Sequence, residues 1–590
     1  MKKHWNLQTI HSQTDLHSWM IEIAQAISNI HEQLQQLPTT NWQPIVQNIL
    51  NDLQEVIGDT DEIEDSLACL SEVLEDEDSD MMAQLLSQHA RVMQQRSSLQ
   101  ATFAQALKHL PEKEWLRFLD KPALAPIRFY LDEQRTVANA LLAPEQEHLI
   151  QALSTDGFHR WEDYYDIVRA ACQISHEGKV RSIDTTLHDV SHIGEREERK
   201  ALAQALEQTL DAHADTFAYQ LNSIAGFRLN LYKQRGWRLL QETCQQNRIS
   251  EQALQVMCGV IDQHQTLART FFKRKIALTR VNEPAWYDLS IANFSSDTRL
   301  SYEQAAELII TQCHRFNERA GKLATHAFSA GWIETGTDEG GWGFCASLPR
   351  SKESRIFLPF RGTYTDVVTL AHEFGHAYHN HLLHDEPIFA QQKGTSAAEV
   401  ASTFMENLVL DAVLAQTNNT QDTLALLETK IQADFLYVTT IPQLFAFEQQ
   451  LYHERQTGIL SAKELCHLLS EVQMPVYEGI ITDVYQHEWV TLPHLYDTRK
   501  AFYNIPYTIG YFLSGELYNR SKQTGASFAA TYDAFLKDSG KMTIEQLAQT
   551  YLQADLCGAD FWEKSLQPLR DTIDLYISLT EGMVGDRNCV

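Results

Sequence analysis

Residues 369–376 read Thr-Leu-Ala-His-Glu-Phe-Gly-His, an H-E-x-x-H motif inside an apolar stretch that suits a helix. On a helix, His372 and His376 are about one turn apart and lie on the same face. A zinc ion takes about four ligands at about 2.0–2.2 Å, so these two imidazoles would supply half of a zinc site. Glu373 follows the first histidine and is the candidate general base for a water at the metal.

The residues around the motif favour a partly buried helix over a surface helix whose His and Glu face water. Thr363 and Asp366 have the spacing of a capping box, which predicts that the helix begins there. Residues 367–371 are mostly apolar, as expected of a core. Gly375 costs about 1 kcal/mol relative to Ala inside a helix. Its presence therefore predicts that another backbone or side chain comes close at this point.

A third metal ligand is expected from the next helix, since a catalytic zinc usually has three protein ligands and one open position. Residues 397–407 contain Glu399 and Glu406, which are seven residues apart and share a helix face with Thr403. One acid can bind the metal, and the other can hold a ligand histidine through its second ring nitrogen. The spacing leaves open which acid does which. The alternative is two exposed acids on an amphipathic helix.

The stretch from Leu358 to residue 379 resembles the active-site region of oligoendopeptidase F. That enzyme belongs with thimet oligopeptidase among the zinc peptidases whose third ligand is a Glu. The resemblance implies one Zn²⁺ per chain, and it extends over about residues 110–575. It assigns the metal ligands as His372, His376 and Glu399. It also implies that Glu406 is the acid that supports a ligand histidine.

A third block, residues 493–511, also resembles the family, in which a His and tyrosines from this region face the zinc and stabilise the oxyanion. By resemblance, His494, Tyr503 and Tyr507 carry these roles beside the base Glu373. Four tyrosines are candidates for contact with the oxyanion: Tyr496, Tyr503, Tyr507 and Tyr511. The last three repeat at i, i+4 and i+8, so a helix would align them in one stripe. A plain core stripe is the alternative, and packing is the expected role of Tyr511.

Composition indicates a globular protein and disfavours several partners. The chain has 590 residues, 44% of them hydrophobic, and a formal net charge of −30. Such a charge disfavours binding to nucleic acid or to an anionic membrane, because phosphates are bound by basic patches. The nine cysteines are scattered without a C-x-x-C pair, so neither a disulfide framework nor a thiolate zinc site is expected. The N-terminus shows no signal peptide, and a cytoplasmic location is expected.

Periodicity predicts a mainly α-helical fold. Helices are expected over residues 14–110, over 127–325 with a break near 178–194, and from 363 to about 580. Short segments between glycines predict a small antiparallel β-sheet directly before the zinc helix. The predicted strands are Trp332–Glu334, Phe344–Leu348 and Ile356–Phe360.

These patterns and the resemblance to the family together imply three regions. They are an N-terminal acidic helical region (1–112), an oligopeptidase F N-terminal-like helical domain (113–200) and a zinc peptidase catalytic domain (201–580). The acidic region includes the run of four acids at residues 75–78, which we expect to be solvated. The resemblance implies a large zincin-type oligopeptidase with a deep substrate channel between two helical lobes.

The sequence thus predicts a zinc metalloendopeptidase that hydrolyses internal bonds of short oligopeptides, with Glu373 activating the water. Restriction to short peptides is implied by the resemblance alone. One alternative is a carboxypeptidase with the same zinc helix. Another is a catalytically silent, zinc-stabilised peptide-binding protein, which the intact Glu373 disfavours because a pure binder needs no base.

Overall fold

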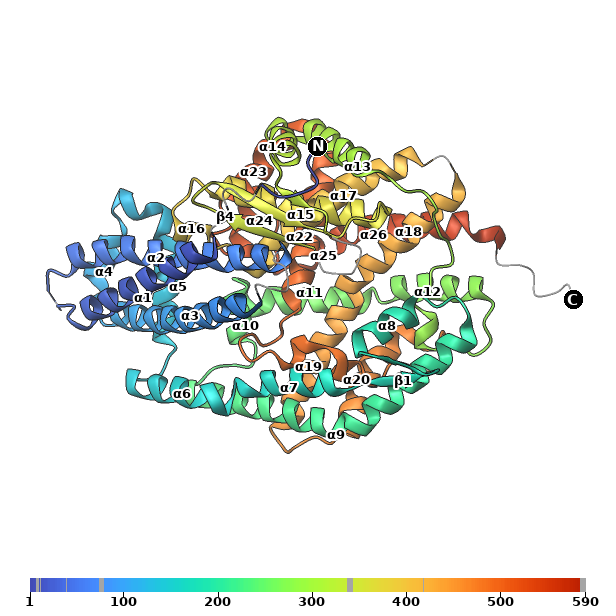
Figure 1. The fold of residues 1–590 in the computed structure, drawn as a ribbon, viewed down its shortest axis with the longest axis horizontal. Helices are drawn as coiled ribbons and strands as arrows, with labels where there is room; N and C mark the ends of the chain where they lie inside the picture. Colours follow the sequence, from blue (N-terminus) through green and yellow to red (C-terminus); the bar gives the residue numbers. More distant parts are fainter. Residues whose placement is uncertain are drawn as a thin grey trace, which may run out of the picture. The chain divides into compact units, whose positions relative to one another are not determined.

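The computed structural model describes residues 1–6, 10, 12–38, 40–73, 79–336, 343–417 and 419–583, which excludes the acidic run at 75–78. The described chain is mainly helical with a few short strands, and the expected fold class is confirmed (Figure 1). The chain divides into two compact units. The first unit contains Met1–Leu141, Thr298–Gln416 and Leu513–Ala554, and the second contains Leu142–Asp297, Thr417–Phe512 and Asp555–Val590.

The first unit begins with long helices that lie side by side and bury a common apolar core (Figure 1). Their expected positions are confirmed, and the chain breaks as predicted at the prolines that follow. The helices of this part are α1 (Gln13–Gln35), α2 (Gln43–Val73), α3 (Ser79–Lys108), α4 (Glu112–Leu119), the 3-10 helix Pro122–Ile127 and α5 (Arg128–Asn139). The rest of the unit adds α13 (Tyr302–Phe316), α14 (Glu318–Ala330), α15 (Tyr364–Leu383), α16 (Ile388–Gln391), α17 (Gly394–Gln416), α23 (Ala529–Lys537) and α24 (Ile544–Leu552).

A three-stranded sheet precedes α15, in the order β3-β5-β4. Its strands are β3 (Ile333–Glu334), β4 (Phe344–Leu348) and β5 (Glu353–Phe357). The hairpin β4–β5 is antiparallel as expected, but β3 pairs with β5 in parallel, so the expectation of an all-antiparallel sheet is corrected. The third strand also begins at Glu353 rather than Ile356, because the tight turn after β4 lets pairing start immediately. Strand patterns carry side-chain alternation but not the direction of the partner strand.

The sheet edge formed by β4 is partly covered by α2. The Asp65 carboxylate accepts a hydrogen bond from the Ser347 backbone N–H at 2.6 Å, and Glu62 accepts one from Arg350 N–H at 2.9 Å. The backbone N–H of Ser347, on the open edge of the sheet, is therefore already hydrogen-bonded to a carboxylate of α2.

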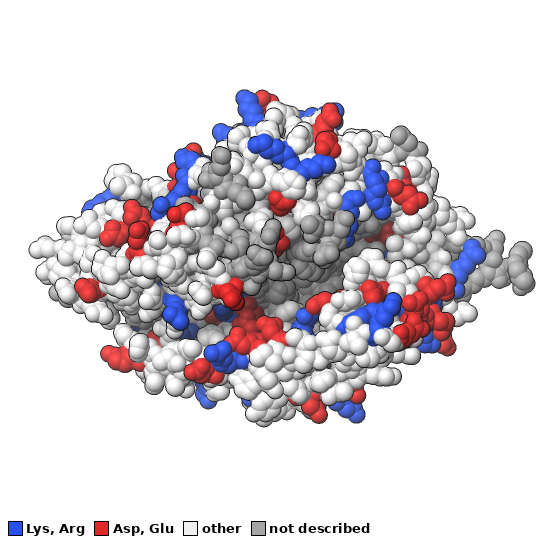
Figure 2. Space-filling view, viewed as in Figure 1, with Lys and Arg blue, Asp and Glu red and all other residues white. Residues whose placement is uncertain are grey.

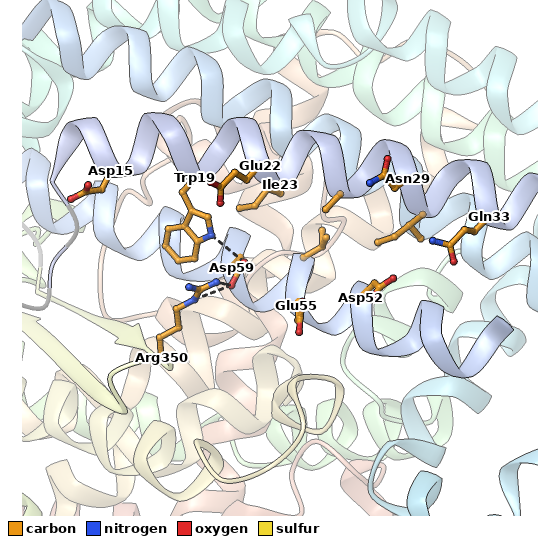
Figure 3. Close-up of a pocket in the computed structure, with 13 residues that line it drawn as sticks. Asp15, Trp19, Glu22, Ile23, Asn29, Gln33, Asp52, Glu55, Asp59 and Arg350 are labelled. Carbon is orange, nitrogen blue, oxygen red and sulfur yellow. Dashed lines mark hydrogen bonds and ion pairs between the residues drawn. The ribbon is translucent and has the colours of Figure 1, made fainter. Parts of the chain in front are cut away.

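A cavity of about 610 Å³ lies between α1 and α2 (Figure 3). At one end, Asp59 accepts hydrogen bonds from Trp19 Nε1 at 3.1 Å and from Arg350 Nη2 at 2.5 Å. The Arg350 guanidinium also lies 4.2 Å from the centre of the Trp19 ring. These contacts tie the turn after β4 to both helices and so help to fix the sheet.

The second unit is built around α9 (Arg196–Arg235), a helix of 40 residues, and has its own core. Its other helices before residue 297 are α6 (Pro144–Gly157), α7 (Arg160–Ala171), α8 (Ile183–His192), α10 (Gln241–Gln246), α11 (Glu251–Gln263) and α12 (Thr266–Thr279). Later helices are α18 (Thr420–Phe435), α19 (Ile441–Arg455), α20 (Ala462–Tyr477), α21 (Glu488–Thr491), α25 (Ala559–Ser565) and α26 (Gln567–Leu579), with α22 (Ile505–Thr524) continuing into the first unit.

The break expected near residues 178–194 contains more structure than predicted. A two-stranded hairpin, β1 (Ile174–His176) and β2 (Lys179–Arg181), turns at Gly178 with φ +73° and is followed directly by α8. Glycine tolerates this left-handed backbone at little cost, which explains its place in the turn. Three-residue strands are too short to produce a readable alternation, so the sequence pattern missed them.

Acidic and basic side chains are interspersed on the face shown in Figure 2. Within the described ranges, none of the helices combines the length and apolarity that a membrane span requires. The cysteines of the described part, eight in number, are all free thiols.

Candidate metal centre and active site

Helix α15 carries the H-E-x-x-H motif, and its start is as predicted. Thr363 is the N-cap, and its hydroxyl accepts the Asp366 N–H at 3.1 Å. The Asp366 carboxylate accepts the Thr363 N–H in return at 3.0 Å. These two hydrogen bonds confirm the capping box. They fix the residue at which the helix begins and therefore the face on which the two histidines lie.

Gly375 lies where α15 packs directly against the backbone of α17. A Cβ at this position would lie 2.4 Å from the Ala401 carbonyl oxygen and 2.5 Å from Ser402 Cα. The predicted close approach is therefore confirmed, and the partner is the backbone of the helix that carries Glu399. Glycine between the two histidines allows the two helices to bring their polar groups together.

Three potential ligand atoms converge between α15 and α17. The Nε2 atoms of His372 and His376 are 3.2 Å apart, and Glu399 Oε2 lies 3.6 and 3.7 Å from them. Within the described residues, these three side chains form the one group of His, Cys, Asp and Glu that could hold a metal ion. Tetrahedral bonds of about 2.0–2.2 Å place two ligand atoms about 3.3–3.6 Å apart, so the donor set and its spacing suit zinc.

Glu406 lies behind the first histidine. Its Oε1 contacts His372 Nδ1, on the side of the ring opposite the converging Nε2. A carboxylate in this position fixes the orientation of the ring, so that Nε2 faces the other two ligand atoms. Burial lowers the pKa of His372, but the hydrogen bond and negative charge of Glu406 outweigh it and raise the pKa to about 9. The structure thus places the two acids of α17 differently, Glu399 beside both imidazoles and Glu406 behind one.

The second histidine is kept neutral. Burial and the neighbouring charge of His372 hold the pKa of His376 well below its usual value, and the backbone of Ala398 opposes this through a hydrogen bond. A neutral imidazole has a lone pair to offer to a metal. On the same side, Ser402 Oγ donates to Glu399 Oε2 at 3.1 Å and so orients that carboxylate.

Glu373 is 6% exposed and projects next to the start of β4. A Cβ at Gly343 would lie 3.1 Å from Glu373 Oε1. Burial raises the pKa of this carboxyl to about 7, with the positive charge of His372 opposing and Glu399 and Glu406 adding to it. A carboxyl whose pKa lies near neutrality can both accept and return a proton under physiological conditions.

Sequence reasoning did not single out two residues of this site, Gly343 and Ser402. Gly343 was visible only as one of several glycines before the zinc helix. Ser402 was visible as a small residue three positions after Glu399, where a helix places it on a neighbouring face. The contact with the Glu399 carboxylate could have been proposed from that spacing, but the contact of Gly343 with Glu373 depends on how the sheet packs.

The residues of the third block belong to the second unit. The rings of His494 and Tyr503 stack with centroids 4.2 Å apart and planes 7° apart. Burial lowers the pKa of His494, with a hydrogen bond to Asn504 opposing. Helix α22 begins at Ile505, so Tyr503 precedes it and the expected three-tyrosine stripe is corrected. Phe502, directly before Tyr503, has left-handed backbone with φ +54°, and residues 501–504 form a turn that precedes the helix.

The other tyrosines of the block fall into two kinds of environment. Tyr507 lies on the first turn of α22 and is half-buried. Tyr511 is 8% exposed and stacks on Tyr437 at 5.2 Å, as suits a packing role. Tyr496 is fully buried and stacks on Tyr165 at 3.9 Å, which places it in the core of the second unit.

Two family models match the chain and together span more than half of it. The model of peptidase family M3 matches residues 316–566, which include α15 and α17. The model described as oligopeptidase F matches residues 107–173. The chromosomal oligoendopeptidase F of Lactococcus lactis subsp. cremoris is 24% identical over 331 residues, which are 54% of this chain and 53% of that protein. Oligopeptidase PepF of Bacillus subtilis (strain 168) is 22% identical over 366 residues, 58% of this chain and 52% of its own length. The chain thus spans about half the length of these curated relatives.

Solved structures share the fold over nearly the whole chain. A protein from Chlamydophila abortus superposes with a TM-score of 0.82 at 18% identity, covering 98% of both chains. Oligoendopeptidase F from Enterococcus faecium superposes with a TM-score of 0.70 at 16% identity, covering 96% of this chain and 99% of the other. At such identities the likeness establishes the fold.

Proposed function

Because the model of peptidase family M3 matches residues 316–566, we propose that the chain is a member of this family and a zinc-dependent endopeptidase that hydrolyses internal bonds of short peptides. The observation that carries this proposal is the convergence of His372 Nε2, His376 Nε2 and Glu399 Oε2 beside the buried carboxyl of Glu373. A structural zinc site is usually closed by four protein ligands, whereas a catalytic site keeps a position open. Three ligands and an adjacent base are what a hydrolytic site requires.

In this proposal, His372, His376 and Glu399 hold one zinc ion, and Glu406 and Ser402 orient two of these ligands. When bound, zinc supplies a Lewis acid for a water molecule and for the scissile carbonyl. Glu373 takes a proton from the attacking water and returns it to the leaving amine. Its pKa of about 7 suits both transfers, although a nearby cation would lower the pKa by favouring the charged form.

The sheet edge next to Glu373 supports binding of an extended peptide. Strand β4 is an edge strand of its sheet, and Gly343, directly before it, lies beside the base. A peptide could add to this edge through main-chain hydrogen bonds, as many extended ligands do. Because Asp65 already binds the Ser347 N–H, the added strand would pair only with the part of β4 before that residue. This limits how many substrate residues pair on that side.

The family resemblance of residues 493–511 suggests which side chains stabilise the oxyanion. We assign this role to Tyr507, and we assign contact with the substrate or the oxyanion to the stacked pair Tyr503 and His494. One well-placed donor to an oxyanion lowers the barrier by about 2.7–4 kcal/mol. The half-buried environment of Tyr507 supports this role, while the buried, stacked rings of Tyr511 and Tyr496 suit packing.

The deciding experiment is mass spectrometry of the products formed from a defined peptide library by the full chain. Internal cuts that stop with a chelator and return with added Zn²⁺ are expected. Trimming of single residues from the C-terminus would instead indicate a carboxypeptidase. Zinc binding without any cleavage would indicate a peptide-binding protein.

The matched variant for this experiment is Glu373→Gln, which keeps the shape of the side chain but removes the base. It should retain one zinc per chain in metal analysis and lose about 10²–10⁴-fold in turnover. Turnover close to that of the wild type would contradict the proposed mechanism even if the products are internal fragments.

A further inference from the structure

Buried side chains from three helices hold both ends of the segment Asp497–Phe502 in the second unit. Arg228 Nη2 donates to the Asp497 carbonyl at 2.5 Å, and Thr243 Oγ1 donates to the Ala501 carbonyl at 3.2 Å. The Phe502 N–H donates to Glu448 Oε1 at 3.3 Å. These donors and acceptors come from α9, α10 and α19, so three helices converge on six residues.

The outer part of the same segment is also bound. Glu162 of α7 accepts both the N–H and the hydroxyl of Thr498, at 3.1 and 2.7 Å. The Asp497 carboxylate closes a turn by accepting the N–H groups of Arg499 and Lys500, at 2.7 and 2.6 Å. Each residue of the segment therefore makes or receives a defined hydrogen bond. A connection that only joins two helices does not need such complete fixation.

The charged side chains in this arrangement are buried at a cost. Arg228 is 4% exposed and Glu448 is 6% exposed, and no ion pair forms between these two residues. Burial raises the pKa of Glu448 to about 7, with the charge of Arg228 opposing, so desolvation is not fully compensated. Replacing buried charges by apolar groups is often neutral or stabilising. Stability alone therefore does not explain these two residues.

The backbone that they hold is strained. Phe502 adopts φ +54° although it is not glycine, and its ring is locked between Phe445 and Tyr452 at 5.1 and 5.5 Å. Non-glycine residues in this region persist only where the surroundings enforce them, and they concentrate at functional sites. Tyr503 comes directly after this residue and stacks on His494, which lies three residues before Asp497. The fixed segment thus determines the relative position of the two stacked rings.

We infer that Glu448 and Arg228 are positioning residues, which fix the backbone of Asp497–Phe502 so that the His494–Tyr503 stack is held in its working orientation. This inference rests on the proposed function, because it assumes that the stacked pair serves peptide hydrolysis. Glu448 holds the end next to Tyr503 through the Phe502 N–H, and Arg228 holds the end nearer His494 through the Asp497 carbonyl.

The test compares Glu448→Ala and Arg228→Met with wild-type full chain in peptide hydrolysis. Both should lower kcat by up to about 10²-fold, the cost of misplacing a group by about 1 Å, with KM changed less than about twofold. Glu448→Gln should recover most of the rate, since its amide oxygen can still accept the Phe502 N–H. In a Tyr503→Phe, His494→Ala background, Glu448→Ala should cost less than about a further twofold, because residues that act as one unit are not additive.

Glu428→Ala is the matched control in the same unit. Glu428 is as buried as Glu448 and binds Lys275, but it makes no contact with the segment. It should lower the thermal midpoint and leave kcat near the wild-type value. The inference is overturned if Glu428→Ala lowers kcat as much as Glu448→Ala does, or if kcat is unchanged in Glu448→Ala and Arg228→Met. It is also overturned if Glu448→Ala lowers kcat by its full factor in the Tyr503→Phe, His494→Ala background.

Hydrogen exchange separates this inference from the proposed function. Backbone amides of residues 497–504 should exchange faster in Glu448→Ala and Arg228→Met than in wild type or Glu428→Ala. Unchanged exchange overturns the inference whatever the activity. If the wild-type chain cleaves no peptide, the proposed function fails, and so does the assignment of a working role to the stack, even where the exchange pattern changes.

Discussion

Replacing Gly375 by Ala tests whether the approach of α15 to α17 builds the metal centre. The new Cβ would lie 2.4 Å from the Ala401 carbonyl oxygen, whereas ordinary contact begins at 3.4 Å, so the two helices must separate by about 1 Å. Both contacting atoms belong to backbone and cannot rotate away. The expected cost of such overpacking is about 1–3 kcal/mol, and the better helix propensity of Ala returns about 1 kcal/mol at most.

The same displacement acts on the metal ligands. His372 and His376 move with α15 and Glu399 with α17, and their ligand atoms are now 3.6–3.7 Å apart. A change of about 1 Å is large against the tolerance of about 0.2 Å in metal–ligand distances. We expect zinc affinity, measured by competition with a chromogenic chelator, to fall at least about tenfold, with a matching loss of activity at limiting zinc.

Gly259→Ala is the matched control for this change. Gly259 lies inside α11, and a Cβ there meets nothing within 4 Å. Its replacement should raise stability by about 0.5–1 kcal/mol and leave zinc affinity unchanged. The reasoning is refuted if Gly375→Ala melts at or above the wild-type temperature and binds zinc with wild-type affinity.

Three further predictions concern single side chains. Glu399→Ala should lose zinc outright, whereas Glu406→Ala should weaken zinc affinity or activity about 10–100-fold; zinc titration decides, and a larger loss in Glu406→Ala would reverse the assignment. Tyr507→Phe should lower kcat with little change in KM and thermal midpoint, because the hydroxyl is needed only for the oxyanion; unchanged steady-state kinetics would contradict this role. Burial lowers the pKa of His487, but Cys466 and Glu207 raise it to about 10 from its ordinary 6.5. This stabilisation is present below about pH 6.5 and is lost as pH rises to about 10, so Glu207→Gln should lower the melting temperature at pH 6 and have little effect at pH 10.

The zinc helix could be predicted in detail because its signals are local. A capping box, an apolar run and histidines at i and i+4 act within a few turns of one helix, so Thr363 and His376 took their places as expected. The long helices α1 to α3 were predicted for the same reason. By contrast, the direction of β3 against β5 depends on a partner 23 residues away, and the pattern of either strand is the same in both orientations.

The tyrosine block shows the same limit at the candidate site. Spacing placed Tyr503 on one stripe with Tyr507, but the backbone turns to positive φ at Phe502 and α22 begins only at Ile505. The groups that contact Phe502 at this turn, Glu448 and Tyr452, lie some 50 residues earlier in the chain. No local propensity reports them. The domain boundaries at residues 112 and 200, the cytoplasmic location and the roles of the site residues stay predictions.

By itself, the sequence determined the helical class of the protein, the helix that presents two histidines and a base, and the acids that could join them. These properties follow from periodicity and capping, which act over a few residues. Only the tertiary structure decided which acid lies beside both imidazoles and which lies behind one. The two carboxylates share one helix face, so their roles are distinguished only by how α17 packs against α15 at Gly375. This packing places Glu399 beside both imidazoles and Glu406 against Nδ1 of His372.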